Sequence, residues 1–213
     1  NLFLKIRKVK FFDKNRYLKI VKDRDSFFHS SNIKKWNVLK PSNIKRNPIF
    51  LVGFPRSGTT LLDTILRSHP SIEVIEEKPI VSRLITSLTN LSTGGLKSLE
   101  KIDDHQAEKL RKMYFNFLDS EIKNKNSSKI YIDKLPLNIV YVGEILRLFP
   151  NAKFILSLRH PYDCVLSCFM QNFELNDAMA NFSNLEDTAK LYNHVMNLWM
   201  RYLSIFKIKY CEV

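Results

Sequence analysis

The chain has 213 residues, of which 45% are hydrophobic and 12% aromatic. This composition is typical of a globular domain with one sizeable core, and it excludes an intrinsically disordered chain. No apolar run reaches the roughly 18 residues that a membrane-spanning helix requires. The three cysteines have no Cys-x-x-Cys spacing, which argues against a metal site and against a disulfide framework.

Positive charge is concentrated at the start of the chain. The formal net charge is +13; residues 1–46 hold 14 Lys and Arg against 3 Asp and Glu, and the rest of the chain holds 20 against 18. The basicity therefore belongs to the N-terminal segment, and it gives no support for nucleic-acid binding by the domain that follows. We expect no nucleic-acid partner.

The N-terminal segment, residues 1–46, reads as one or two basic helices or irregular structure. Two interpretations stay open for it: the end of an upstream helical region, or an arm that packs on the domain. The domain itself is predicted over residues 47–213, and a first residue other than Met indicates that the sequence can be a fragment.

Short apolar runs alternate with helical periodicity in residues 47–213. Strands are predicted at 49–52, 71–75, 129–133, 153–158 and 207–213, and helices from 60, over 80–92, 104–124 and 139–149, from 161, and over 185–205, with a loop at 93–95. Strands that alternate with helices indicate βαβ units. The sequence thus predicts an α/β fold of three layers, with a central parallel sheet flanked by helices.

A phosphate-binding loop is predicted between the first strand and the first helix. Gly53 and Gly58 bracket four residues, as in the Walker A pattern, and such a loop directs backbone N–H groups of a helix N-terminus at an anion. Thr59 stands where a nucleotide triphosphatase carries lysine, and Arg56 supplies the positive charge instead. We therefore expect a P-loop-type fold that binds an anionic donor without a γ-phosphate and without magnesium.

Charged residues follow four of the predicted strands. The first strand is followed by Arg56, the second by Glu77, the third by Lys134 and the fourth by Arg159. Ligands of parallel sheets bind beyond the carboxyl ends of the strands, so these side chains are expected to converge. Ser167 lies in the helix after Arg159, and this serine and arginine could jointly bind a second phosphate.

The segment Pro55-Arg-Ser-Gly-Thr-Thr60 resembles the phosphosulfate loop of sulfotransferases, whose donor is 3′-phosphoadenosine 5′-phosphosulfate (PAPS). The resemblance is closest to the tyrosylprotein sulfotransferases and to bacterial relatives linked to tetratricopeptide repeats. It implies sulfuryl transfer to a hydroxyl of a protein tyrosine, carbohydrate or lipid, with 3′-phosphoadenosine 5′-phosphate as the product and no metal. The resemblance to bacterial relatives favours a cytoplasmic location.

The resemblance also implies roles for individual residues. Glu77 lies 21 residues after Arg56, as the general base of the family does, and Lys134-Leu135-Pro136 matches the segment whose lysine contacts the transferring group. Catalysis would then rest on Glu77, Arg56 and Lys134. Donor binding would rest on Arg56, Ser57, Gly58, Thr59, Thr60, Arg159 and Ser167, the last two at the 3′-phosphate.

The sequence departs from the family pattern in two places. Residues 168–173 contain no basic residue where one is expected after Ser167, and the family's later segments, which close over the adenine, are expected beyond Val213. We therefore expect the domain to be truncated at its C-terminus. Two alternatives stay open: a P-loop kinase or nucleotidase, which Thr59 disfavours, and a degenerate, non-catalytic module that docks through residues 1–46.

Overall fold

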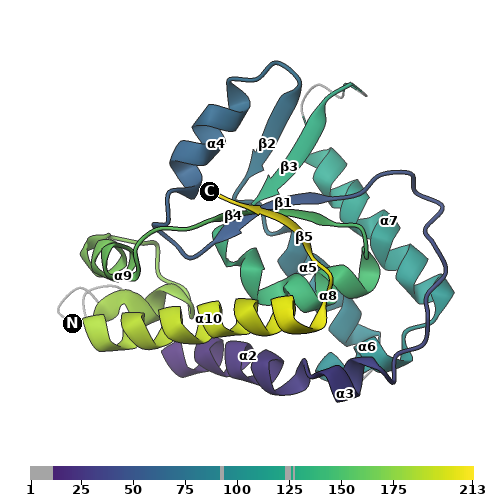
Figure 1. Cartoon of the computed structure of the whole chain (residues 1–213), viewed down its shortest axis with the longest axis horizontal. Helices are drawn as coiled ribbons and strands as arrows, with labels where there is room; N and C mark the ends of the chain where they lie inside the picture. Colours follow the sequence, from purple (N-terminus) through teal and green to yellow (C-terminus); the bar gives the residue numbers. More distant parts are fainter. Residues whose placement is uncertain (1–11, 92–93, 123–125, 127) are drawn as a thin grey trace.

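The computed structural model describes residues 12–91, 94–122, 126 and 128–213. Five parallel strands form one sheet in the order β2-β3-β1-β4-β5 (Figure 1). The strands are β1 (Ile49–Gly53), β2 (Ile72–Glu76), β3 (Ile130–Lys134), β4 (Lys153–Ser157) and β5 (Lys209–Glu212). Because β1 is the middle strand, the loop that follows it lies at the centre of the sheet's carboxyl edge.

Helices and 3₁₀ turns connect the strands. The helices are α2 (Lys14–Phe27), α3 (Ser30–Ile33), α4 (Thr59–Arg67), α5 (Ile80–Asn90), α6 (Ser98–Lys101), α7 (Asp104–Ser120), α8 (Val142–Leu148), α9 (Pro161–Met170) and α10 (Leu185–Ile205), and the 3₁₀ turns are η1 (Gly95–Lys97), η2 (Pro136–Tyr141) and η3 (Met179–Ser183). Within the described residues, none of these helices is long and apolar enough to cross a membrane.

The helices cover both faces of the sheet. On one face Leu51, Val74 and Ile132 form a small apolar cluster under α4. Phe50 and Val52 point to the opposite face, as successive residues of a strand must, and belong to the large core beneath the other helices (Figure 1). This arrangement confirms the predicted three-layer α/β fold with a central parallel sheet.

The predicted elements agree with the structure to within a few residues, and the helix at 185–205 has the predicted ends. The predicted helix at 139–149 was wrong in its first part, because η2 begins at Pro136 and only residues 142–148 are α-helical. The helix from 104 ends at Ser120, although the buried Ile122 continues its apolar spacing. Residues 92, 93, 123 and 124 of these predictions lie outside the described residues.

The described part of the basic N-terminal segment packs into the domain. Figure 1 shows α2 lying along α10. Phe28, which follows α2, is fully buried, and a Cβ atom on Gly143 would lie 2.3 Å from its ring, so glycine is needed there. Arg24 forms an ion pair of 2.7 Å with Glu144, and their side chains are 8% and 0% exposed. The N-terminal helix is thus held by the large core.

Candidate active site

The loop between β1 and α4 has the backbone that a phosphate-binding loop requires. Gly58 has a φ of +99° and precedes α4 without a side-chain cap. Arg56 also has a positive φ, +68°, which is uncommon for a residue with a side chain and indicates a constrained turn. Because the first N–H groups of a helix have no acceptor within it, those at the start of α4 are available to an anion.

The loop is packed tightly against the end of β4. A Cβ atom on Gly53 would lie 2.6 Å from the Ser157 carbonyl oxygen and 2.7 Å from Ser57 Oγ, so a larger residue would displace the loop. Ser157 Oγ donates a hydrogen bond of 2.9 Å to the Ser57 carbonyl. Ser57 Oγ itself is buried and has no partner among the described residues. A buried hydroxyl without a partner is unusual, and here it lies beside the predicted donor loop.

Arg56, Ser167 and Arg159 come together although they are far apart in the chain. Arg56 Nε donates to Ser167 Oγ over 3.0 Å, and Arg159 donates to the Arg56 carbonyl over 3.4 Å. Arg159 also lies 3.5 Å from Asp163, and its side chain is 47% exposed. Two guanidinium groups and a hydroxyl thus meet at the carboxyl ends of β1 and β4. Sequence spacing predicts Arg159 beside Ser167, but the hydrogen bond of Ser167 is with Arg56.

Lys134 and Glu77 form the second polar group of the site. Lys134 ends β3 with its side chain fully buried, and its Nζ lies 2.9 Å from Glu77 Oε1 and 3.2 Å from Glu76 Oε1. The two residues also form a backbone hydrogen bond, in which the Glu77 N–H donates to the Lys134 carbonyl over 2.7 Å. Glu77 has a φ of +50°, which is uncommon for a residue with a side chain and marks a constrained turn after β2.

The two glutamates have different surroundings. Glu76 Oε2 accepts a hydrogen bond of 3.3 Å from Arg67, which also pairs with the buried Asp63. Glu77 has Lys134 as its ionic partner and lines the cavity described below, which Glu76 does not. The geometry therefore leaves Glu77 available to a ligand and holds Glu76 in a network of charges.

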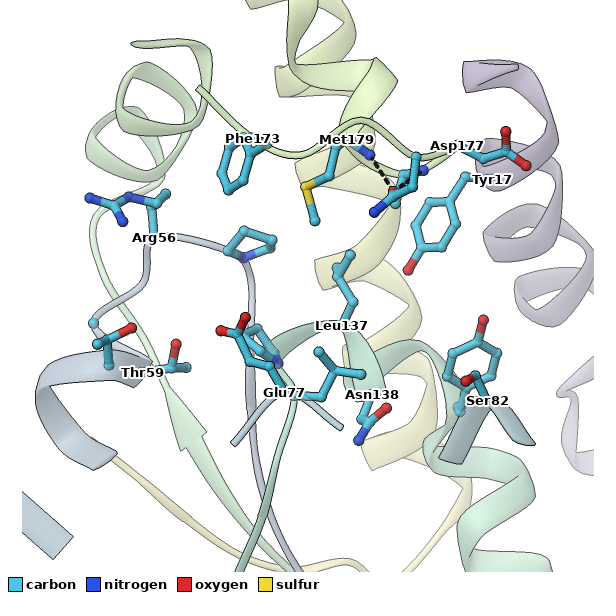
Figure 2. Close-up of a pocket in the computed structure, with 18 of the residues that line it drawn as sticks. Tyr17, Arg56, Thr59, Glu77, Ser82, Leu137, Asn138, Phe173, Asp177 and Met179 are labelled. Carbon is cyan, nitrogen blue, oxygen red and sulfur yellow. Dashed lines mark hydrogen bonds between the residues drawn. The ribbon is translucent and has the colours of Figure 1, made fainter. Parts of the chain in front are cut away.

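A cavity of about 680 Å³ joins these groups. Figure 2 shows Arg56 and Thr59 at one side, Glu77 in the middle, and Tyr17 and Ser82 at the other side. The predicted residues that line it are Arg56, Gly58, Thr59, Thr60, Glu77 and Arg159. Lys134 is not part of the lining and reaches the site through its contact with Glu77.

Part of the lining was not predicted from the sequence. It comprises residues from α2, from η2 and from the chain after α9, among them Tyr17, Ile20, Asn138, Tyr141, Phe173, Asp177 and Met179. These residues belong to no motif, and the helix that carries Tyr17 precedes the phosphate loop in the chain. Its approach to the site depends on packing between distant segments, which the local sequence pattern does not indicate.

Asp133 is a buried carboxyl close to the site but not in its cavity. Its neighbour Lys134 points to the other side of β3, and Asp133 accepts a hydrogen bond of 3.2 Å from the Tyr114 hydroxyl. Burial raises the pKa of Asp133 to about 7, while the Tyr114 hydrogen bond acts in the opposite direction. Asp133 therefore belongs to the core beneath the site.

A parallel sheet with a glycine-bracketed anion loop after its middle strand defines the class of P-loop-type α/β proteins. Within it, this chain belongs to the sulfotransferase family, whose sequence model matches residues 48–213. The match confirms the resemblance that the loop sequence predicts. Among the described residues, no group of three His, Cys, Asp or Glu side chains could hold a metal ion.

The curated relatives include proteins named for tyrosine sulfation. The chain is 32% identical to mouse protein-tyrosine sulfotransferase 1 over 114 residues, which is 52% of this chain and 30% of that protein. It is 30% identical to the Drosophila melanogaster protein-tyrosine sulfotransferase over 156 residues, or 70% and 30% of the two chains. An uncharacterized Aquifex aeolicus protein is 34% identical over 142 residues, 65% of this chain and 19% of that one.

The chain thus spans between a fifth and a third of the length of these three relatives. Among solved structures, sulfotransferase STF9 from Mycobacterium avium aligns with 94% of this chain and 64% of its own, with a TM-score of 0.46 and 13% sequence identity.

Proposed function

We propose that the protein transfers a sulfuryl group from PAPS to the hydroxyl of an acceptor. The observation that carries this proposal is the convergence of Arg56, Arg159 and Glu77 on one cavity beside a loop with available N–H groups. Membership of the sulfotransferase family supports the reaction class. The donor and the acceptor are part of the proposal.

The residues present fit an anionic donor with two phosphate positions. The N–H groups of Gly58, Thr59 and Thr60 would hold the 5′-phosphate, since a helix N-terminus favours an anion. The Ser57 N–H, which the sequence also suggests for this role, instead donates to the Phe54 carbonyl over 3.1 Å. The buried Ser57 hydroxyl has no partner among the described residues and could donate to the same group. Arg159 and Ser167 would hold the 3′-phosphate, with Arg56 between the two positions.

Glu77 would act as the general base. Its carboxylate would take the proton of the acceptor hydroxyl as the new bond from oxygen to sulfur forms. The bond between sulfur and the bridging phosphate oxygen breaks, and the electron pair stays on the released 3′-phosphoadenosine 5′-phosphate. Arg56 and Lys134 would stabilise the negative charge that develops on that oxygen and on the sulfuryl group.

Lys134 can fill this role because its ammonium group is already in place. It lies 2.9 Å from Glu77 Oε1, and its buried side chain has little freedom to move away. A cation held in a fixed position costs no reorganisation when charge develops during the reaction. The same contact holds the Glu77 carboxylate, which lines the cavity.

The experiment is an incubation with ³⁵S-labelled PAPS and a mixture of tyrosine peptides, sugars and lipid alcohols, with EDTA present. We expect label in an acceptor and release of 3′-phosphoadenosine 5′-phosphate. Magnesium-dependent ATP turnover without sulfuryl transfer would instead assign the site to a nucleotide kinase or nucleotidase. Absence of both activities, with no affinity for 3′-phosphoadenosine 5′-phosphate, would favour the non-catalytic module.

A further inference from the structure

The cavity continues beyond Glu77 to an end that the N-terminal helix closes. Tyr17 and Ile20 of α2 line this end, together with Tyr141 of η2, and Figure 2 shows Met179 between Tyr17 and Phe173. Figure 2 shows Tyr17 opposite Arg56 and Thr59. Because α2 precedes the matched residues 48–213, the family comparison assigns no role to it. We call this part of the cavity the α2 end.

The Tyr17 hydroxyl is a buried polar group at the α2 end of the cavity. Tyr17 is 8% exposed, and its hydroxyl has no hydrogen-bond partner among the described residues. In Figure 2 the hydroxyl points into the cavity. Nearly all buried polar groups have a partner, so a ligand in the cavity is the natural partner for this one. Burial raises the pKa of Tyr17 well above its ordinary value, so the hydroxyl stays neutral.

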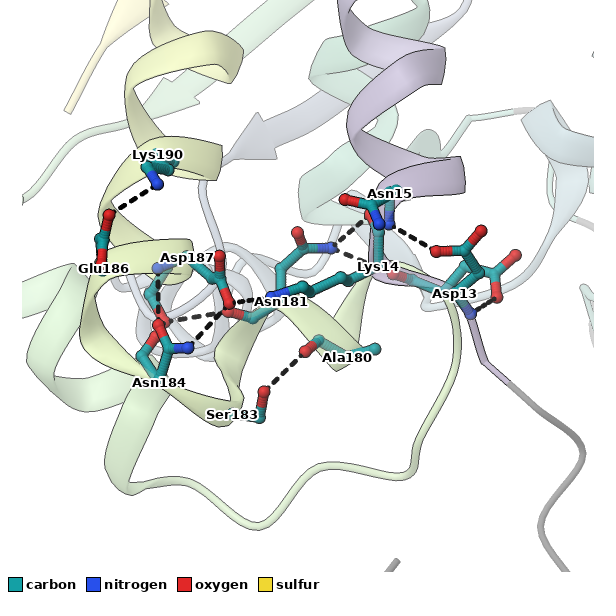
Figure 3. Close-up of polar contacts among 12 residues, drawn as sticks. Asp13, Lys14, Asn15, Ala180, Asn181, Ser183, Asn184, Glu186, Asp187 and Lys190 are labelled. Carbon is teal, nitrogen blue, oxygen red and sulfur yellow. Dashed lines mark hydrogen bonds and ion pairs between the residues drawn. The ribbon is translucent and has the colours of Figure 1, made fainter. Parts of the chain in front are cut away.

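A set of polar contacts fixes the start of α2 to the chain around η3 (Figure 3). The buried Asn181 donates from Nδ2 to the Lys14 carbonyl over 3.2 Å and to the Asp177 carbonyl over 3.1 Å. The Asp13 N–H donates to Asp177 Oδ1 over 2.9 Å, and Lys14 pairs with Asp187 of α10. Tyr17 lies one turn further along α2, so these contacts also fix its position at the cavity.

The charge at the α2 end favours an uncharged ligand. The cations that line the cavity are Arg56 and Arg159, and both belong to the phosphate-loop side. Among the described lining residues away from that side, the charged ones are Glu77 and Asp177, and Asp177 is paired with Arg16 at 3.0 Å. An anionic group placed at the α2 end would lose its hydration without gaining a free cation.

We propose that α2 forms the acceptor subsite, and that the Tyr17 hydroxyl hydrogen-bonds a second polar group on an uncharged, largely apolar acceptor. This inference rests on the proposed function, because it places the reacting hydroxyl of the acceptor at Glu77. The acceptor class is a compact phenol or alcohol that carries another neutral polar group. Acidic peptide segments fit this end poorly.

The test compares wild type, Tyr17→Phe and Tyr210→Phe. The control residue Tyr210 lies in β5, is 42% exposed and does not line the cavity. The probes are 4-(hydroxyalkyl)phenols with side chains of one to three carbons and 4-alkylphenols of equal length. Dissociation constants are measured by calorimetry, with and without 3′-phosphoadenosine 5′-phosphate, and KM is measured where transfer occurs.

We expect wild type and Tyr210→Phe to bind the best hydroxyalkylphenol about 3- to 10-fold more tightly than its alkyl counterpart, which is the usual effect of one neutral hydrogen bond. Tyr17→Phe should lose this preference and keep its melting temperature, because the hydroxyl that it lacks has no hydrogen-bond partner in the described part of the chain. The anionic 4-hydroxyphenylacetate should bind more weakly than 4-hydroxyphenylacetamide in wild type.

A preference that survives in Tyr17→Phe would overturn the inference, as would its absence in wild type. A lower melting temperature with loss of both probe types would assign Tyr17 a structural role and overturn it too. If the Tyr17-dependent preference is found but no probe accepts a sulfuryl group in any assay with PAPS, the subsite stands and the proposed function fails. These outcomes separate a failure of the acceptor subsite from a failure of the proposed sulfuryl transfer.

Discussion

At the scale of single residues, the contacts of each side chain in the site decide whether it is available to a ligand. Glu76 and Glu77 are adjacent in sequence and both contact Lys134, but of the two only Glu77 lines the cavity, and only Glu76 also accepts a hydrogen bond from Arg67. The local sequence does not distinguish them, and the choice of Glu77 as base depends on the resemblance. The structure adds a physical difference between the two carboxylates.

The proposed 3′-phosphate position predicts a difference between two nucleotides. Arg159→Ala and Ser167→Ala should weaken binding of 3′-phosphoadenosine 5′-phosphate by roughly 10- to 150-fold, which is the effect of losing a charge-assisted contact. Binding of adenosine 5′-monophosphate, which lacks the 3′-phosphate, should change little. Calorimetry with both nucleotides makes the comparison. Equal losses for the two would show that Arg159 and Ser167 act on the fold of the loop, to which Arg56 connects them.

Asp133 predicts a pH dependence of stability. Its pKa is raised from 3.8 to about 7 in the folded state, chiefly by burial. Between these values the unfolded chain has released the proton that the folded chain retains, so the free energy of unfolding falls as the pH rises through this window. The difference corresponds to at most about 4 kcal/mol. Asp133→Asn, which cannot ionise, should therefore gain stability relative to wild type between pH 4 and pH 8.

Urea unfolding at several pH values measures this gain. Asp23→Asn is the control, because Asp23 is an exposed residue paired with Lys19 on α2, and its substitution should change stability little. A stability difference between Asp133→Asn and wild type that stays constant from pH 4 to pH 8 would contradict the role assigned to burial.

At the scale of elements, the N-terminal helix is held by the core as well as by polar contacts. Phe28→Ala should lower the free energy of unfolding by about 3–5 kcal/mol, the usual cost of removing a buried phenylalanine ring. Phe12→Ala is the control in the same segment, since Phe12 is 36% exposed, and it should cost much less. Urea denaturation measures both. A similar, small loss for the two variants would mean that the segment is only loosely attached.

Much of the fold follows from local pattern, as β1 and α4 illustrate. The run Ile49 to Val52 is typical of a buried strand, and Gly53 and Gly58 mark the turn into the helix, so the position of this loop was predictable. The position of Tyr17 in the lining of the cavity was not predictable from the sequence. It depends on the close contact of Phe28 with Gly143, which brings two distant segments together. That contact depends on shape, which spacing within either segment does not reveal.

At the scale of the whole molecule, ion pairs join the basic N-terminal segment to the domain. Lys14 pairs with Asp187, Arg16 with Asp177, Arg24 with Glu144, and Arg46 with Asp119. Basic residues of the segment therefore neutralise carboxylates of the domain. Isolated exposed pairs contribute little to stability, but Lys14, Arg16 and Arg24 all lie on α2, so their three pairs hold this helix against the domain.

We propose that the protein transfers a sulfuryl group with Glu77 as the general base. The most direct test is single-turnover transfer of ³⁵S from PAPS by wild type, Glu77→Gln and Glu76→Gln. Glu77→Gln should bind the donor nearly as well as wild type while transfer falls by about 10²–10⁴-fold, the range of general base catalysis, and Glu76→Gln should retain most of the activity. Near-normal transfer by Glu77→Gln, or a loss confined to Glu76→Gln, would contradict the account.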